Sequence, residues 1–215
     1  MSQTLKKYEY FYQDSNLKRH HSFLMAPLLS MLPGSTNPQG QKLRVLDLGC
    51  GNGSLSHALA QQGYEVVGIE ESELGFTQAR SSFPDCHFIQ ASIYDLPYAE
   101  LDNSFDVVIS VEVIEHLFYP RELVKAAKQC LKPNGRLIIT TPYHGYFKNL
   151  VLAISGKMDK HFHVLWDGGH IKFFSVKTLS RLVEAEGYAD IHFSFAGRLP
   201  YLWKSMLCCC TRTES

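Results

Sequence analysis

From Arg44 onward, short apolar runs alternate with segments of helix length, and this alternation restricts the fold more than any other feature of the sequence. It is typical of a parallel sheet with helices on both faces, which is a Rossmann-like, doubly wound α/β fold. The predicted strands are Arg44–Leu48, Glu65–Glu70, His87–Gln90, Phe105–Val111, Arg136–Thr141 and Ile191–Phe195. The predicted helices are Ser54–Gln62, one behind Ser72, one after Pro120, and one from Ser175 that ends before Gly187. Lys132–Arg136 (KPNGR) predicts a turn into the fifth strand.

A glycine-rich turn follows the first predicted strand in the stretch VLDLGCGNGSL. Gly49, Gly51 and Gly53 let the backbone turn sharply and approach a ligand closely. Their GxGxG spacing differs from the GxGxxG of a nicotinamide-dependent oxidoreductase and from a P-loop. Glu70 ends the second strand, where a carboxylate can accept both hydroxyls of a ribose. The pattern predicts an adenosyl ligand without a pyrophosphate, and the alternative is a tight turn with no ligand.

Two carboxylates and a histidine follow the fourth predicted strand in VEVIEHL. The first and fourth strands are neighbours in this topology, so Glu112, Glu115 and His116 are expected at the mouth of the cofactor cleft. Taken alone, the triplet has two interpretations. The glutamates either cap the next helix without a metal, or they bind a divalent cation together with the histidine.

The motifs VLDLGCGNG, VVGIEES, FDVVISVEVIEHL and LKPNGRLIITTP occur in this order between about Leu43 and Thr141. They resemble the motif series of class I S-adenosylmethionine-dependent methyltransferases. The resemblance implies S-adenosyl-L-methionine as cofactor and a seven-stranded sheet whose last strand is antiparallel. Ser205–Thr211 is the expected last strand, with Cys208–Cys210 as small apolar fillers.

The same resemblance assigns the cofactor contacts. Asp47, Gly49 and Gly51 would contact the methionine end of the cofactor, and Glu70 its ribose. The family commonly has an acidic residue near the adenine amine, whereas this chain has QASIYDLP, in which Ser92 can still hydrogen-bond the adenine edge. The full implied set is Asp47, Gly49, Gly51, Glu70, Ser92, Ile93 and Ser110.

Two later stretches, TTPYHGYFKN and DGGHIKFFSVKTL, are similar to the same region in two metal-using branches of the family. These are the ubiquinone-biosynthesis O-methyltransferases and the small-RNA 3′-terminal 2′-O-methyltransferases. The ligands carried over from the RNA enzymes are Glu112, Glu115, His116 and His170, a set that suits Mg²⁺, Mn²⁺, Fe²⁺ or Zn²⁺. A bound cation lowers the pKa of a hydroxyl and chelates two adjacent oxygens, which favours O-methylation. The expected catalytic residues are Glu112, His116 and His144. In a metal-free alternative, either His116 or His144 is the general base.

The chain divides into two predicted parts. Residues 1–40, with the aromatic cluster Tyr8–Tyr12, are expected to form a helical cap over the cofactor, and residues 41–215 the methyltransferase domain. Residues 142–174 form a longer connection than packing requires, so a substrate lid is predicted there. Within it, Asn149–Met158 (NLVLAISGKM) is apolar enough to contact lipid, and a buried lid helix explains it equally well.

Composition narrows the substrate class. Lysine plus arginine equals aspartate plus glutamate at 21 each, so no overall field recruits nucleic acid. We therefore expect a small hydrophobic phenol, a catechol or a polyprenyl quinol precursor as methyl acceptor, with RNA second. A catalytically silent cofactor-binding partner subunit is the alternative from a different class. Six cysteines without CxxC pairing and no segment of roughly 20 apolar residues predict a cytoplasmic protein whose membrane contact, if any, is peripheral.

Overall fold

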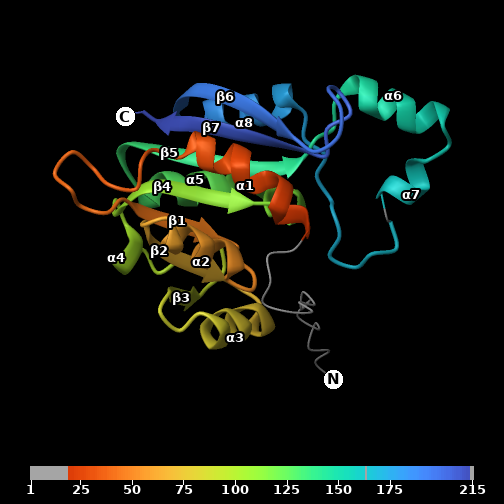
Figure 1. Ribbon diagram of the computed structural model, residues 1–215. Coiled ribbons are helices and arrows are strands. Elements are labelled where there is room, and N and C mark those ends of the chain that lie inside the picture. Colours follow the sequence, from red (N-terminus) through yellow and green to blue (C-terminus); the bar gives the residue numbers. More distant parts are fainter. Residues whose placement is uncertain (1–18, 163, 214–215) are drawn as a thin grey trace.

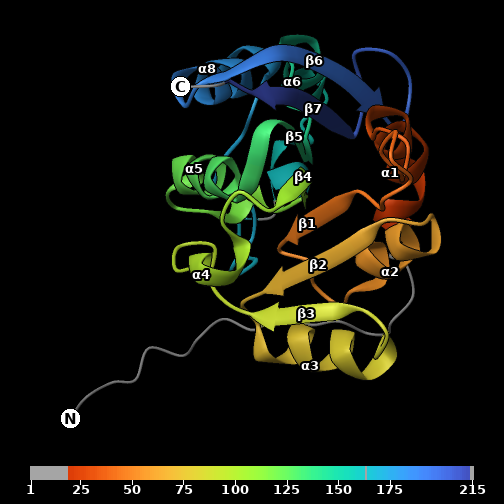
Figure 2. The ribbon, with the colours of Figure 1, turned by 90° about the vertical axis from the view of Figure 1, so that its left-hand side faces the viewer.

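The computed structural model describes residues 19–162 and 164–213, and a seven-stranded sheet forms its centre. The strands are β1 (Arg44–Leu48), β2 (Glu65–Glu70), β3 (His87–Gln90), β4 (Phe105–Val111), β5 (Leu131–Pro142), β6 (Tyr188–Ala196) and β7 (Ser205–Arg212). Their order is β3-β2-β1-β4-β5-β7-β6, which Figure 2 shows along the sheet. Strands β1 to β5 pair in parallel, whereas β7 runs antiparallel to both β5 and β6. The predicted doubly wound sheet with an antiparallel last strand is confirmed.

Helices cover both faces of the sheet (Figure 2). They are α1 (Arg19–Met31), α2 (Ser54–Gln61), α3 (Glu73–Ser82), α4 (Tyr98–Leu101), the short 3₁₀ turn η1 (Ile114–His116), α5 (Pro120–Cys130), α6 (Tyr146–Ile154), α7 (Met158–Phe162) and α8 (Val176–Ala185). On one face, Leu28 of α1 and Leu59 of α2 pack against buried side chains such as Val107. On the other face, Leu123 of α5 and Leu179 of α8 pack in a second buried cluster. Burial of these two faces supplies the main stabilisation of the fold.

The predicted helix starts are confirmed, and two of them have serine caps. The Ser72 hydroxyl accepts a hydrogen bond from the Gly75 amide at 3.1 Å, and α3 begins at the next residue. Pro120 is the first residue of α5. Ser175 and Thr178 bond each other reciprocally at the start of α8. The two serine caps satisfy amides that the first turn of a helix leaves without partners, whereas Pro120 has no amide hydrogen to satisfy.

The start of β5 differs from the prediction. The strand begins at Leu131 rather than Arg136, because Leu131 pairs with Phe105 while Arg136 pairs with Val107. The four residues between them bulge out opposite a single residue of β4, and Asn134 takes a positive φ of 61°. The turn predicted at Lys132–Arg136 is therefore a bulge inside a longer strand.

The cysteine-rich stretch lies in β7, as predicted. Cys208 and Cys210 are buried and Cys209 is half-buried, so they fill the space between neighbouring elements. Within residues 19–162 and 164–213, no helix has the length and apolar character needed to cross a membrane. The cluster Tyr8–Tyr12 of the predicted cofactor cap lies outside the described residues. The described helix α1 packs along the sheet near β6 and β7, and its Leu24 and Leu28 are buried against the sheet.

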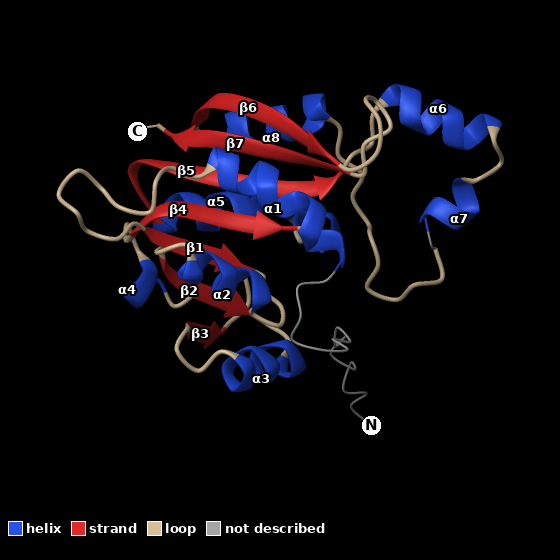
Figure 3. Cartoon of the chain, in the orientation of Figure 1, coloured by secondary structure: helices blue, strands red, loops and turns tan. Residues whose placement is uncertain are grey.

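The segment predicted as a substrate lid leaves the sheet at the carboxyl end of β5. It carries α6 and α7, which project beyond the strand ends in Figure 1. Figure 3 shows the long loop that then returns from α7 to the sheet before α8 begins. Because β1, β2 and β4 end at the same edge, this segment stands beside the ends of the strands that carry the predicted site.

Candidate functional site

The glycine turn after β1 has a backbone shape that favours glycine. Gly49, Gly51 and Gly53 have φ angles of 80°, 58° and 77°, a region that other residues rarely adopt. A Cβ on Gly49 would lie 2.7 Å from a Val113 methyl carbon, and one on Gly53 would lie 2.7 Å from the Phe88 ring. Positive φ and close packing therefore both account for glycine at positions 49 and 53.

Glu70 joins this turn to the start of α3. One carboxylate oxygen accepts a hydrogen bond from the Gly51 amide and the other from the Ser72 amide, both at 2.8 Å. The side chain is only 7% exposed at the end of β2. Each carboxylate oxygen has more than one acceptor site, so this arrangement still allows two ribose hydroxyls to donate to Glu70.

Asp47 and Ser110 lie in the core beneath the turn. The Ser56 hydroxyl of α2 donates to the Asp47 carboxylate at 2.6 Å, and burial raises the Asp47 pKa to about 7. The Ser110 hydroxyl donates to the carbonyl oxygen of Leu48 at 2.9 Å and so links β4 to β1. Both side chains thus hold the strands that carry the site.

The segment predicted to contact adenine follows β3. Ser92 donates to a carboxylate oxygen of Glu71 at 3.1 Å and lines a hollow of about 450 Å³ together with Asp95. Ile93 is buried in the core on the α5 face of the sheet. The loop therefore presents Ser92 to this hollow and turns Ile93 inward.

Glu115, His116 and His170 come together, and their ligand atoms all lie within 4.8 Å of one another. Glu115 is completely buried, and one of its oxygens accepts a hydrogen bond from the Thr141 hydroxyl at 3.0 Å. Its other oxygen, Oε1, has no hydrogen-bond partner and lies 3.9 Å from Nε2 of His170. Burial, followed by the charge of Glu112, raises the pKa of Glu115 well above its usual range.

Backbone contacts fasten the His170 segment to the turn that holds Glu115. The amides of Ile171 and Lys172 donate to the Glu115 carbonyl at 2.9 and 3.0 Å. Nδ1 of His116 donates to the Gly168 carbonyl at 2.9 Å, which leaves Nε2 as the acceptor nitrogen of the neutral ring. Two distant parts of the chain therefore build one group of ligands.

Glu112 does not join this group. Its φ is 56°, and its carboxylate accepts a hydrogen bond from the Thr140 hydroxyl at 3.0 Å. Burial raises the Glu112 pKa to about 7, while hydrogen bonds from Thr140 and Ser205 and the charge of Lys148 act against that rise. The positive φ turns the side chain toward β5 and β7, and three of the four predicted metal ligands remain together.

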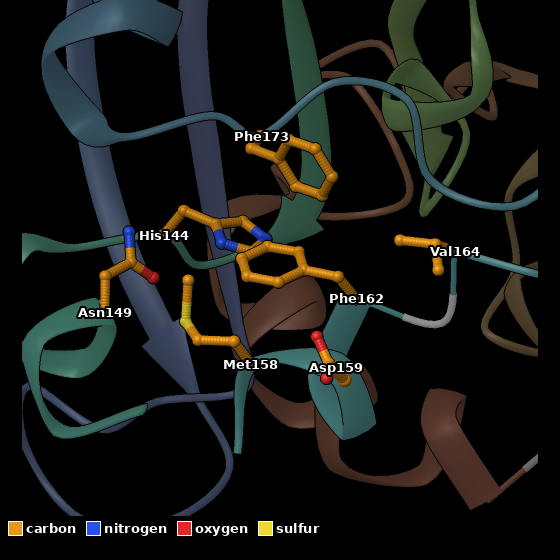
Figure 4. A pocket seen from close by; sticks show the side chains of 7 residues that line it. All are labelled: His144, Asn149, Met158, Asp159, Phe162, Val164 and Phe173. Carbon is orange, nitrogen blue, oxygen red and sulfur yellow. The ribbon is translucent and has the colours of Figure 1, made fainter. Parts of the chain in front are cut away.

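The lid segment contains a pocket of about 350 Å³. Figure 4 shows its lining residues, which are His144, Asn149, Met158, Asp159, Phe162, Val164 and Phe173. Burial lowers the pKa of His144 to about 4, with smaller effects of the same sign from Lys148 and His161. Sequence reasoning singled out His144 but missed Asn149, whose amide within the apolar run YFKNLVLAI was the available signal.

Comparisons with known proteins agree with this architecture. A family model described as "Methyltransferase domain" matches residues 17–192. The ubiquinone biosynthesis O-methyltransferase of Azoarcus sp. is 34% identical over 176 residues, which are 77% of this chain and 72% of that relative. The protein of the same name from Rickettsia akari is 32% identical over 129 residues, 58% of this chain and 50% of the relative.

The fold is shared with solved structures. The crystal structure of an S-adenosylmethionine dependent methyltransferase from Mesorhizobium loti matches with a TM-score of 0.66 at 22% identity, over 87% of this chain and 96% of that one.

The curated relatives are longer than the matched region, since the chain spans half of the Rickettsia akari protein and 72% of the Azoarcus one.

Proposed function

Because the chain belongs to the S-adenosylmethionine-dependent methyltransferases, we propose that it methylates an oxygen of a small hydrophobic phenol, catechol or polyprenyl quinol precursor with the help of a divalent cation. The observation that carries this proposal is the buried Glu115 oxygen without a hydrogen-bond partner, which faces two histidines beside an apolar pocket.

The residues present fit the cofactor. The glycine turn leaves room for close approach of a ligand, and Glu70 stands where it can accept the ribose hydroxyls. When bound, S-adenosylmethionine supplies an electrophilic methyl group on a sulfonium. Asp47 supports the turn from below through Ser56, and Ser92 is the proposed adenine contact.

The residues also fit a divalent cation. A carboxylate oxygen buried without a hydrogen bond is costly, and a nearby cation would compensate it. One carboxylate and two imidazoles form a donor set common at transition-metal sites, so Glu115, His116 and His170 would hold the ion. Such an ion would lower the pKa of an acceptor hydroxyl and hold two adjacent oxygens.

The chain's own residues orient these ligands. Thr141 fixes the Glu115 carboxylate, and the Gly168 carbonyl fixes the His116 ring in one tautomer. Of the predicted catalytic residues outside the ligand group, Glu112 is the stronger base, because burial raises its pKa to about 7. His144, with a pKa of about 4, is a weaker base.

The pocket supports a small aromatic acceptor over RNA. Its walls include Phe162, Phe173 and Met158, and the described residues that line it include no lysine or arginine. A terminal nucleotide would need cationic side chains for its phosphates. Two curated relatives are named ubiquinone biosynthesis O-methyltransferases, which fits an acceptor of this chemistry.

The apolar helix α6 supports contact with a lipid surface. Tyr146 and Ile154 at its two ends are 84% and 79% exposed, and Phe147, Leu150 and Val151 are exposed between them. A peripheral membrane contact through α6 would bring the pocket close to lipid-like acceptors.

The test supplies labelled S-adenosylmethionine with catechol, with extracted lipid and with RNA. We expect label in the catechol or the lipid, complete loss of transfer with excess chelator, and cofactor binding that survives the chelator. His170→Ala should lower the activity at least about 100-fold, whereas His87→Ala, an exposed histidine on β3, should not. Full activity of protein that elemental analysis shows to be metal-free would overturn the metal-assisted mechanism. Label in RNA would instead support the RNA methyltransferase. Label in none of the three acceptors would support the catalytically silent subunit.

A further inference from the structure

A hollow lined by polar groups adjoins the proposed ribose site. Strands β2 and β3 end side by side (Figure 2), where Gln90 pairs with Glu70 and the Ala91 amide donates to the Glu70 carbonyl at 3.1 Å. Gln90 and Ala91 also line the hollow of about 450 Å³ that contains Ser92 and Asp95. A base carried by a ribose at Glu70 therefore has this hollow within its reach.

The Ser92 hydroxyl gives its proton to another side chain. Its Oγ donates to Oε2 of Glu71 at 3.1 Å and accepts a hydrogen bond from the Tyr94 amide at 3.3 Å. The Asp95 amide donates to the Ser92 carbonyl at 3.0 Å and closes the turn around the hydroxyl. Because a hydroxyl has a single proton, Ser92 has none to donate to a ring nitrogen of the base.

The same hydrogen bond brings a carboxylate to the hollow from a different strand. Glu71 directly follows the end of β2 and precedes Ser92 by 21 residues. A carboxylate has about four acceptor sites and no proton to donate, so it can accept from Ser92 and from a ligand together. The Asp95 carboxylate lines the same hollow. The hollow therefore suits an amino group, which donates, and disfavours a carbonyl oxygen, which only accepts.

Glu71 can replace an acid that the motif after β3 lacks. The sequence predicts that Ser92 meets the edge of adenine, at a position where the family commonly has an acidic residue. The structure places the Glu71 carboxylate within hydrogen-bond distance of that serine. The missing negative charge is thus supplied from the end of β2.

We propose that Glu71, oriented by Ser92, accepts a hydrogen bond from the exocyclic amine of adenine and so selects an adenosyl cofactor over one without that amine. Ser92 then acts through Glu71 and is a positioning residue. The inference rests on the proposed function, because Glu70 has to hold the ribose for the base to reach the hollow.

The test compares S-adenosylhomocysteine with the analogue in which hydrogen replaces the amino group of the purine, so that only this donor is lost. Calorimetry on the full chain should give a Kd for S-adenosylhomocysteine at least about fivefold lower than for the analogue. Glu71→Ala should reduce that ratio to about one by weakening the amine-bearing ligand. Glu73→Ala removes the same charge from the exposed first turn of α3 and should keep the wild-type ratio.

Two further variants test the neighbours of Glu71. Ser92→Ala removes the hydrogen bond that orients the carboxylate, so its ratio should lie between those of the wild type and Glu71→Ala. Asp95→Asn should keep the wild-type ratio. Loss of the ratio in Asp95→Asn together with its survival in Glu71→Ala would overturn the proposal, because Asp95 would then be the group that recognises the amine.

The wild type separates this inference from the proposed function. Tight and equal binding of both compounds would overturn the inference alone, since the cofactor site would still be occupied. Binding of neither compound would overturn the proposed function and this inference with it. The thermal unfolding midpoint verifies that each variant is folded.

Discussion

At the scale of single residues, Glu70 gives the most direct test of the cofactor site. Glu70→Gln keeps the size of the side chain but removes its charge and places an NH₂ group against an amide donor of Gly51 or Ser72. Charge-assisted hydrogen bonds contribute about 1.5–3 kcal/mol. We therefore expect the Kd for S-adenosylmethionine to rise about 10- to 100-fold in calorimetry.

Glu65→Gln is the matched control for this change, because Glu65 lies at the other end of β2 with an exposed side chain. It should leave the affinity for the cofactor unchanged. Equal cofactor binding by wild type and Glu70→Gln, or tight binding of NAD to the wild type, would contradict the assignment of Glu70.

The sequence was sufficient to predict that Glu115, His116 and His170 come together. It was not sufficient to predict where the Glu112 side chain points. The motif indicates that two glutamates leave the same turn. Only the fold decides that Glu112 takes a positive φ and meets the Thr140 hydroxyl on the neighbouring strand, 28 residues later. Asn149 was missed for a similar reason, since it lines a pocket that forms only when α6, α7 and the loop up to Phe173 fold against each other.

At the scale of elements, α6 contains one buried lysine among exposed apolar side chains. Lys148 is 4% exposed, and its amine donates to the Tyr143 carbonyl at 2.7 Å. Burial lowers its pKa from 10.5 to about 8, helped by Arg198 and opposed by Glu112. Between pH 8 and 10.5 the lysine binds a proton in the unfolded chain but has lost it in the folded protein. The contribution of Lys148 to the wild-type free energy of unfolding therefore increases as pH rises through that window.

Lys148→Met removes this titration. The free energy of unfolding of the variant minus that of the wild type should be largest below pH 8. This difference should fall by at most about 3 kcal/mol by pH 10.5. Denaturant titrations at several pH values measure the difference. Lys157→Met, an exposed lysine just after α6, is the control. A Lys148→Met difference that does not change with pH would show that the charge is not buried in solution.

The elements themselves were predictable to different degrees. Strands β1 to β4 match their predicted bounds, because buried parallel strands are continuous apolar runs closed by turn residues. Two differences arise where pairing with a neighbour extends a strand beyond its apolar core, at Leu131 in β5 and at Tyr188 in β6. For α6 the sequence left lipid contact and burial open, and packing leaves this helix largely exposed.

At the scale of the whole molecule, the net charge of zero separates the two substrate classes. With 21 positive and 21 negative side chains, no long-range field speeds the arrival of a charged substrate. Transfer to a neutral phenol or catechol should therefore change less than about twofold in kcat/KM between 50 and 200 mM salt. RNA methylation would instead fall about 10³-fold or more if six or more phosphates are contacted, because salt replaces the counterions released on binding.

The salt series needs a control for effects on the protein itself. Binding of S-adenosylhomocysteine and the thermal unfolding midpoint, followed over the same salt range, show whether cofactor site and fold are unchanged. A steep loss of catechol transfer with both readouts constant would mean that charge does guide the acceptor. Combined with binding of short RNA in a gel-shift assay, that result would reverse the ranking of acceptors, because an apolar pocket alone produces no such salt dependence.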